Sequence, residues 1–232
     1  MTTIVRQRAR KQPAEIRREE VLDAAVRVFA RESFRGAGTA EIAREAGIAE
    51  PTIYRHFSSK RDLYLAALRR CCELVGTAFR QIDANNEDAL EAIMGFAEWY
   101  DRSISGNPAH LLLRMRAESE TNDDDVRREL AQAYDVLPAL VAATVRRGQE
   151  QGVFKKHVSP EGVAWMFMAM GQIADLTHML GMEGDLARQC FMDMGILFWE
   201  MLVEPATMPR VLARVDEWAA DEGPHALAHV KR

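Results

Sequence analysis

Apolar residues recur at three- and four-residue steps along almost the whole chain, and no stretch alternates with the two-residue period of a strand. In residues 14–31, for example, Val21, Leu22, Ala25 and Phe29 form one apolar stripe. The pattern predicts an all-α protein. Further helices are expected at residues 40–46, 51–57, 60–84, 87–103, 108–118, 124–151, 160–180, 185–203 and 209–221.

Capping residues predict where several of these helices begin and end. Thr39 is expected to N-cap the short helix that follows it, and Gly47 to close that helix in a left-handed turn. Ser159 is expected to N-cap the helix that Gly181 closes. Pro138 falls inside a long helix and is expected to kink it.

The segment 39–54 has the spacing of two short helices joined by a sharp turn. Ala43 is small enough for the helices to touch, and Gly47 tolerates the positive φ of the turn. The apolar residues Ile42, Ile48 and Ile53 are spaced to face the preceding helix. This register is typical of a DNA-binding helix-turn-helix, although a generic helical hairpin can share it.

Charge is distributed unevenly between the two ends of the chain. The overall net charge is −5, but residues 1–70 hold 15 basic against 9 acidic residues, a net charge of +6. A basic head on an acidic body favours nucleic acid as the partner of the head. The sharpest basic cluster includes Arg6, Arg8 and Arg10, within a flexible arm over residues 1–13. Such an arm is either a solvated tail or a segment that enters the minor groove of DNA.

Two adjoining motifs identify the family that this head resembles. Thr52-Ile-Tyr-Arg-His-Phe57 and Ser58-Ser-Lys60-Arg-Asp-Leu63, preceded by Val21-Leu-Asp-Ala-Ala25, resemble the signature of the TetR (tetracycline-repressor) family of bacterial regulators. The resemblance implies a three-helix DNA-binding domain followed by a helical domain that binds a small ligand and dimerises. We therefore expect a basic arm at 1–13, a helix-turn-helix domain at 14–59, an effector-binding and dimerisation domain at 60–222 and a frayed tail at 223–232.

The recognition helix of such a domain enters the major groove by its N-terminal end. Side chains near that end are placed to touch bases, whereas neighbouring donors reach phosphate oxygens without reading sequence. The candidates for base contact are Glu50, Pro51, Thr52 and Arg55, and those for phosphate contact are Thr39, Tyr54, His56 and Lys60. The resemblance implies the same four phosphate contacts. Ala49 stands where the family usually has a capping serine or threonine, and Glu50 places an acid near DNA.

The later helices predict both a dimer and a ligand site. Residues 160–180 and 185–203 are apolar on more than one side, which favours burial against the core and against a second copy of the chain. The resemblance likewise implies a homodimer through the last two long helices. The candidate ligand-binding residues are Phe96, Trp99, Tyr100, Met115, Tyr134, Trp165 and Met168, each of which ordinary core packing also explains. Methionine adapts to irregular apolar ligands, so an elongated or amphipathic effector is favoured.

Other candidate chemistry is sparse. Arg114 or Arg116 is placed to meet an acidic headgroup, although a solvated face is the simpler interpretation. Asp175 and His178 lie one turn apart, but no third ligand accompanies them, so neither a metal site nor a cofactor is predicted. Cys71 and Cys72 suggest two small apolar residues rather than a redox sensor. No enzyme motif, bilayer-spanning stretch or secretory signal is visible, which predicts a soluble, cytoplasmic protein with no membrane partner.

These observations favour a transcriptional repressor that binds a palindromic operator as a dimer and is released by a small effector. Two alternatives remain: a DNA-binding protein of the same fold without an effector, acting architecturally or in cell division, and an activator. An enzyme carrying a helical DNA tether is disfavoured because no catalytic motif accompanies the head.

Overall fold

Helices and short connections make up the computed structural model, which describes residues 14–106, 108–182 and 185–220. Within those residues the β-structure is a single isolated bridge between Phe154 and Val203. The predicted all-α class is therefore confirmed. The helices are α1 (Ala14–Arg31), α2 (Thr39–Glu45), α3 (Glu50–Ile53), α4 (Lys60–Ala84), α5 (Ala89–Gly106), α6 (Ala109–Glu118), α7 (Asp124–Glu150), α8 (Pro160–Met179), α9 (Asp185–Leu202) and α10 (Met208–Ala220). The predicted basic arm, with Arg6, Arg8 and Arg10, and the predicted frayed tail lie outside the described residues.

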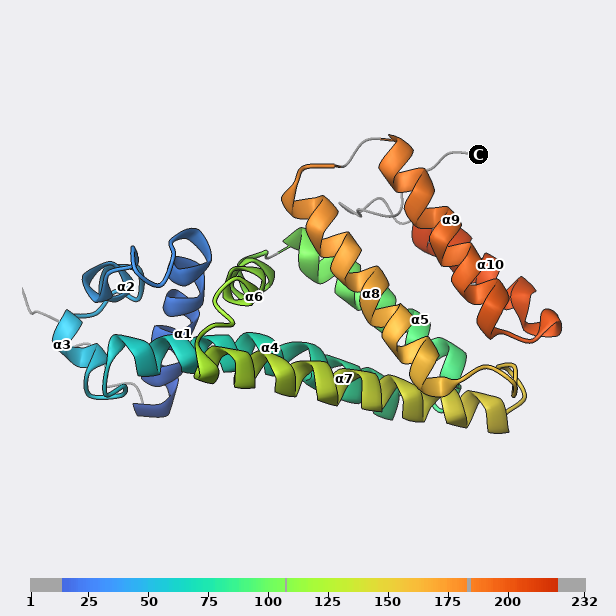
Figure 1. Ribbon diagram of the computed structural model, residues 1–232, viewed down its shortest axis with the longest axis horizontal. Helices are drawn as coiled ribbons and strands as arrows, with labels where there is room; N and C mark the ends of the chain where they lie inside the picture. Colours follow the sequence, from blue (N-terminus) through green and yellow to red (C-terminus); the bar gives the residue numbers. More distant parts are fainter. Residues whose placement is uncertain (1–13, 107, 183–184, 221–232) are drawn as a thin grey trace, which may run out of the picture.

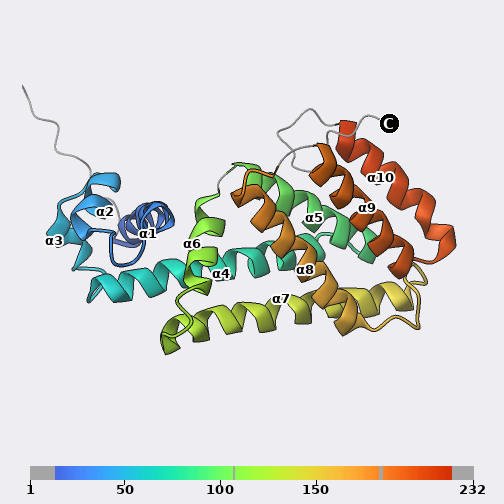
Figure 2. The ribbon, with the colours of Figure 1, turned by 45° about the horizontal axis from the view of Figure 1, so that its top comes forward.

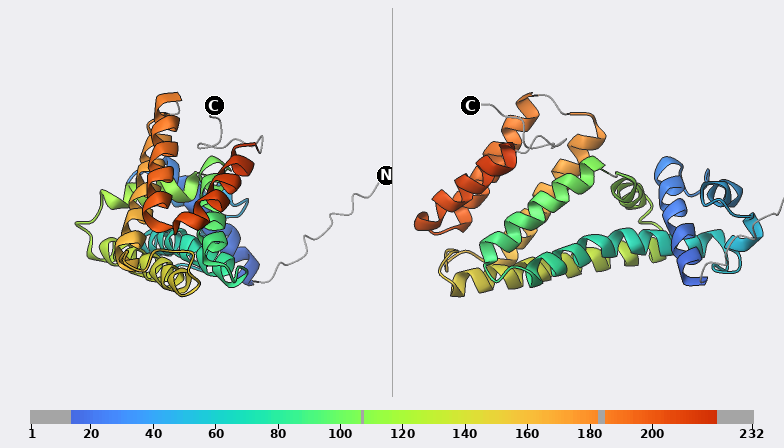
Figure 3. Two further views of the ribbon diagram at one scale, coloured as in Figure 1. Left: turned by 90° about the vertical axis from the view of Figure 1, so that its right-hand side faces the viewer. Right: turned by 180° about the vertical axis from the view of Figure 1, so that it is seen from behind.

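The molecule is elongated, with the three-helix head (α1–α3) at one end and α9 and α10 towards the other (Figure 1). The long helices α4 and α7 run side by side and connect the two ends, as the views in Figures 2 and 3 also show. Helix α5 packs on α4, and α8 packs on α7. Helix α6 lies between the head and these later helices and packs against α1.

Several predicted helix boundaries are confirmed by local geometry. Gly47 has a φ of 65° and Gly181 a φ of 63°, the left-handed conformation that glycine adopts without strain. The side chain of Ser159 accepts a hydrogen bond from the Gly162 amide and so N-caps α8. These short-range signals are reliable because the residues that determine them lie within one helical turn.

Two local predictions need correction. Thr39 is the first residue of α2 and not its N-cap, because Gly38 occupies the cap position and the Thr39 hydroxyl is bonded elsewhere. Helix α3 ends at Ile53 and not at Phe57; the chain continues in hydrogen-bonded turns that carry Phe57 into the core. Helix α7 continues through Pro138, which is buried, and the kink expected at this proline stays a prediction.

The buried apolar residues form two cores. The first joins the three-helix head to the start of α4, around Phe29, Ile42 and Leu63, and also includes Leu113 and Ala117 of α6. The second is built from the rest of α4 with α5, α7, α8, α9 and α10. The core of the head therefore extends past residue 59, because α1 and two very short helices bury too little apolar surface to form a closed core by themselves.

None of the helices in the described ranges is long and apolar enough to cross a membrane. The cysteines of α4 are structural in character, since burial raises the pKa of the Cys71 thiol and raises that of Cys72 to about 11. A thiol with a raised pKa is a poor nucleophile at neutral pH, which argues against a redox sensor at this position.

Candidate nucleic-acid interface and internal cavities

The turn between α2 and α3 has the geometry that its sequence predicts. The Ile48 amide donates a 2.9 Å hydrogen bond to the Ala43 carbonyl across Gly47, which closes the turn. Ile42 and Ile53 are fully buried, and Ala43 is buried where the two helices meet. The apolar spacing of this segment thus fixes α3 against α1 through side-chain burial.

Charged side chains also hold α2 on α1. Arg27 donates a 2.8 Å hydrogen bond to Glu45, and Arg31 donates one of 3.2 Å to the same carboxylate. These two guanidinium groups lower the pKa of Glu45 from its ordinary value. Arg27 and Arg31 of α1 are therefore paired within the head and hold α2 in place.

The predicted base-contact residues lie around the exposed side of α3. Pro51 and Arg55 are exposed, and Glu50 and Thr52 are partly exposed. Tyr54 has half of its surface exposed, an unusual degree for a large aromatic side chain in a folded protein. These residues form an accessible surface on the outer face of the helix-turn-helix.

Glu50 is held by two neighbours from the predicted set. The Thr39 hydroxyl donates a 2.5 Å hydrogen bond to Glu50 Oε1, and the Tyr54 hydroxyl lies 3.2 Å from the Thr39 oxygen. This arrangement joins the first residue of α2 to both ends of α3. Sequence reasoning placed all three residues at the interface but did not foresee that they bond to one another.

Lys60, at the start of α4, lies beside the same surface. Its ammonium group is 4.8 Å from the centre of the Phe34 ring, a cation–π distance. His56 is partly exposed on the preceding turn. The aromatic residue Phe34 therefore positions a charged group that sequence reasoning assigned to phosphate contact.

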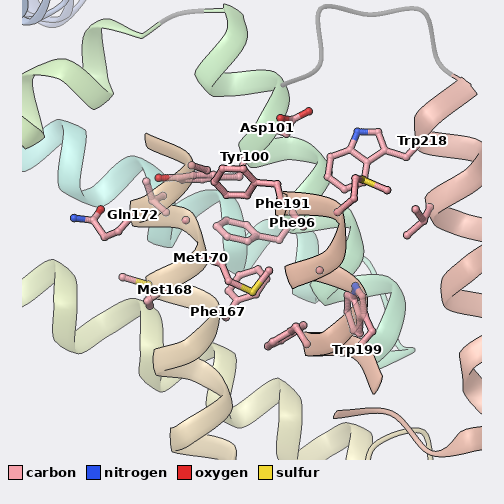
Figure 4. A pocket seen from close by; sticks show the side chains of 18 of the residues that line it. Phe96, Tyr100, Asp101, Phe167, Met168, Met170, Gln172, Phe191, Trp199 and Trp218 are labelled. Atoms are coloured by element: carbon pink, nitrogen blue, oxygen red, sulfur yellow. The ribbon is translucent and has the colours of Figure 1, made fainter. Parts of the chain in front are cut away.

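A cavity of about 160 Å³ lies among α5, α8, α9 and α10 (Figure 4). Its walls are mainly aromatic and thioether side chains, so we refer to it as the aromatic cavity. The aromatic and methionine residues that line it include Phe96, Tyr100, Phe167, Met168, Met170, Phe191, Met192, Phe198, Trp199 and Trp218.

A second cavity of about 340 Å³ lies among α4, α6, α7 and α8, and we refer to it as the polar cavity. Its lining includes the charged residues Arg69, Arg80 and Glu129, together with Tyr134. Arg114, Met168, Val75 and Leu137 line both cavities. The two spaces therefore adjoin along a shared wall.

A buried polar network occupies part of that wall. Arg114 of α6 forms a 2.5 Å ion pair with Asp175 of α8, and the Tyr100 hydroxyl of α5 donates to the same carboxylate at 2.8 Å. Asp175 is fully buried, and this burial raises its pKa to about 6. Gln172 Oε1 accepts from Arg114, and Gln172 Nε2 donates to Glu118. The simpler interpretation of Arg114, a solvated face, is wrong, because its side chain keeps only 11% of its surface exposed.

The structure brings together only part of the predicted ligand-binding set. Phe96, Tyr100 and Met168 line the aromatic cavity, and Tyr134 lines the polar one. Trp99, Met115 and Trp165 line neither, and Trp165 is 56% exposed. The cavity residues that sequence reasoning did not assign to a ligand site are Phe167, Met170, Phe191, Trp199 and Trp218. Phe191 and Trp199 are two helical turns apart, but this spacing occurs equally in cores, so the sequence holds no signal that separates the two roles.

Asp175 does not belong to a metal site with His178. Its carboxylate is occupied by Arg114 and Tyr100. Across the described ranges, no group of three or more His, Cys, Asp or Glu side chains is arranged to hold a metal ion.

An exposed helix-turn-helix at one end, followed by a helical body with two adjoining cavities, is the arrangement of a DNA-binding regulator. Residues 21–67 match the family described as bacterial regulatory proteins, tetR family. The chain belongs to the TetR family of helix-turn-helix transcriptional regulators, as its sequence motifs predict. The relatives reported below are regulators of transcription and not enzymes.

Known relatives agree with this assignment in sequence and in fold. The HTH-type transcriptional activator FasR of Mycolicibacterium smegmatis is 38% identical over 98 residues, which cover 39% of this chain and 45% of FasR. The chain thus matches less than half the length of that relative. A putative transcriptional regulator from Saccharomonospora viridis, solved in complex with choline, superposes with a TM-score of 0.71 at 25% identity, covering 82% of this chain and 99% of that one. A TetR-family regulator from Agrobacterium tumefaciens superposes with a TM-score of 0.69 at 21% identity, covering 83% and 100%.

Proposed function

We propose that this protein is a ligand-responsive repressor, which binds a palindromic operator as a homodimer and is released when a small apolar or amphipathic molecule enters its cavities. The observation that carries the proposal is the position of α6. Leu113 and Ala117 of this helix belong to the core of the head, while Arg114 between them lines both cavities. An occupant that moves Arg114 therefore acts on the helix against which α1 packs.

The proposed contact with DNA uses the exposed side of α3 and its neighbours. In this proposal Arg55 and Thr52 contact base edges. The phosphate oxygens are contacted by Tyr54, His56 and Lys60. The Thr39 hydroxyl is hydrogen-bonded to Glu50, so any contact that Thr39 makes with the DNA backbone also places Glu50 beside it. The basic arm with Arg6, Arg8 and Arg10 is proposed to enter the adjacent minor groove. Deletion of residues before Pro13 should then lower both the affinity and its salt slope.

The proposed dimer uses the outer faces of α8 and α9. Side chains such as Phe167 and Phe198 of these helices turn inward, but an apolar set stays exposed. The exposed apolar residues on this side are Trp165, Met166, Ile173, Leu176, Met179, Leu180, Met194 and Leu197. Exposed apolar patches mark protein interfaces, so we assign these residues to the proposed dimer. A second copy places a second α3 against DNA, which a palindromic operator requires.

The observations favour repression over activation less strongly than they favour DNA binding, since the relative FasR is named as an activator. Release by a ligand favours repression, whereas an activator is expected to hold its operator in the regulated state. A protein of this fold without any effector is the other alternative, and the two adjoining cavities disfavour it.

The test is an electrophoretic shift with the full chain on DNA from upstream of its own gene, with and without small-molecule extracts of the source cells. The proposal expects a shifted complex with two protein chains per site, which an extract releases. Absence of any shift would contradict a regulator of its own promoter. A complex that no extract alters would support the effector-free alternative. A reporter gene behind the same promoter then separates repression from activation.

A further inference from the structure

The aromatic cavity is too small to hold an elongated molecule by itself. Its volume is about 160 Å³. An engineered cavity of roughly 150 Å³ in another protein holds a single benzene molecule. Sites for small organic ligands measure about 300–1,000 Å³. A ligand much longer than one ring must therefore extend beyond this cavity.

The two cavities differ in their exposure to solvent. Each aromatic-cavity residue that the structure describes is buried or only partly exposed. The lining of the polar cavity, by contrast, includes exposed residues of α4 and α7, namely Arg69, Glu73, Thr77, Arg80 and Gln132. A ligand that arrives from solution therefore meets the polar cavity first.

Met168 is the most easily displaced of the four residues that line both cavities. Arg114 is held by its ion pair with the buried Asp175. Val75 and Leu137 have short, branched side chains that stay close to the backbones of α4 and α7. The side chain of Met168 is unbranched, with three rotatable bonds, and adapts to irregular apolar space. Its rotation can open a passage between the two cavities.

Beyond Met168 the aromatic cavity begins with apolar side chains. The ring of Phe167, the neighbouring residue of α8, lies 5.9 Å from the ring of Phe96 between centroids. Figure 4 shows Asp101 and Trp218 together on the side of the cavity away from Met168. A chain that passes Met168 therefore packs on aromatic rings before it reaches the Asp101 carboxylate.

The polar cavity contains both donors and acceptors for a polar headgroup. Arg69 and Glu129 line it and are paired with each other, and Arg80 and Glu73 add one charge of each sign. Guanidinium groups donate hydrogen bonds and carboxylates accept them. A headgroup with several hydroxyls therefore finds partners of both kinds here. The polar and the aromatic cavity thus match the two ends of an amphiphile.

We propose that one elongated amphiphile occupies both cavities at once, with its hydrogen-bonding headgroup in the polar cavity and its apolar chain passing Met168 into the aromatic cavity. The inference rests on the proposed ligand-responsive function and names the shape and chemical class of the effector. Met168 is then a specificity-determining residue, because the chain length that the protein accepts depends on the passage beside it.

The test measures binding to the full-length protein without DNA, by calorimetry, at probe concentrations too low for micelles to form. The probes are butyl, hexyl and octyl glucoside, which share one headgroup and differ in chain length. Each added CH₂ that becomes buried should tighten binding about 3- to 4-fold. Ethylbenzene, which fits the aromatic cavity alone, should compete with octyl glucoside for the protein.

Variants of Met168 test the passage itself. Met168→Phe fills the passage with a rigid ring, and it should weaken octyl glucoside at least about 10-fold, the loss of two or more buried CH₂ groups, while sparing butyl glucoside. Met168→Ala keeps the passage open and should bind octyl glucoside close to the wild-type affinity. Met166→Phe makes the matched change at an exposed methionine of α8 outside both cavities and should alter no probe. Thermal unfolding confirms that each variant is folded.

Two results with the wild-type protein overturn the inference: glucoside affinity that does not rise with chain length, including no binding at millimolar concentration, or independent binding of octyl glucoside and ethylbenzene. So does an octyl glucoside affinity that Met168→Phe leaves unchanged, or that Met166→Phe lowers equally. A separate DNA-shift experiment with octyl glucoside distinguishes the two proposals. Binding across both cavities without release of DNA supports the inference about the cavities and contradicts release by a ligand.

Discussion

Thr39 and Glu50 are joined by a 2.5 Å hydrogen bond from the hydroxyl to Oε1, across the turn of the helix-turn-helix. The bond ties the first residue of α2 to the first residue of α3. It also means that the acid nearest the proposed DNA surface is held by the protein itself.

Glu50→Gln should therefore tighten DNA binding. The amide oxygen still accepts from Thr39, whereas the negative charge that repels phosphates is removed. We expect an affinity about 2- to 5-fold higher at low salt, with a smaller gain at high salt, because exposed charges are screened. Fluorescence anisotropy on operator and on random DNA measures both. A loss of affinity for the operator alone would show instead that Glu50 reads a base, such as the amino group of cytosine.

Gly148→Ala should destabilise the protein, although alanine normally favours helices. A Cβ at residue 148 would lie 2.1 Å from Cδ2 of the fully buried Phe154, so α7 and the ring must move apart. Overpacking of this kind costs about 1–3 kcal/mol of unfolding free energy. Chemical denaturation measures it.

Gly95→Ala in α5 is the matched control for that variant. Its new Cβ would meet only Ile82 Cγ2, at the ordinary distance of 3.5 Å. We expect it to stabilise the protein by about 0.5–1 kcal/mol, the usual gain from replacing a helical glycine. Equal effects of the two variants would contradict the close packing of Phe154 on α7.

Asp175 should make the protein less stable as the pH rises through the weakly acidic range. Its pKa in the folded protein is raised to about 6 from an ordinary value of 3.8, because burial disfavours the carboxylate. The folded state therefore holds this proton more tightly than the unfolded state does. The stabilisation is complete below pH 4 and is lost as the pH rises through 6.

Comparison with Asp175→Asn isolates this contribution. Between pH 4 and pH 7 the wild-type protein should lose on the order of 2 kcal/mol of unfolding free energy relative to the variant, which does not titrate there. Urea unfolding at several pH values gives the difference. If the unfolding free energies of the two proteins changed in parallel with pH, the raised pKa of Asp175 would be contradicted.

Leu197→Asp should disrupt the proposed dimer. Leu197 of α9 is 63% exposed in the single chain, on the face proposed to meet a second copy. Burying an unpaired carboxylate there should weaken association at least about 100-fold, or ~3 kcal/mol. Sedimentation velocity reports the change. Leu212→Asp, at an exposed leucine of α10, is the control and should leave the oligomeric state unchanged.

Sequence reasoning succeeded wherever the determining residues are close together along the chain. The caps at Ser159 and Gly181, the turn at Gly47 and the bounds of α4 follow from contacts within one or two turns. The signature over residues 52–63 is equally local, and it was enough to identify the family and to place the accessible surface around α3.

Tertiary structure alone decided the roles of residues that meet across helices. Thr39 bonds to Glu50, and Arg114 pairs with Asp175, at separations of 11 and 61 residues, which no local pattern encodes. The cavities could not be predicted either, because a helical stripe of aromatic and methionine residues has the same sequence pattern whether it fills a core or lines a cavity. The sequence by itself determined the helices and the DNA-binding head, because periodicity and capping are short-range; only packing decided which side chains face a cavity, because that depends on how several helices fit together.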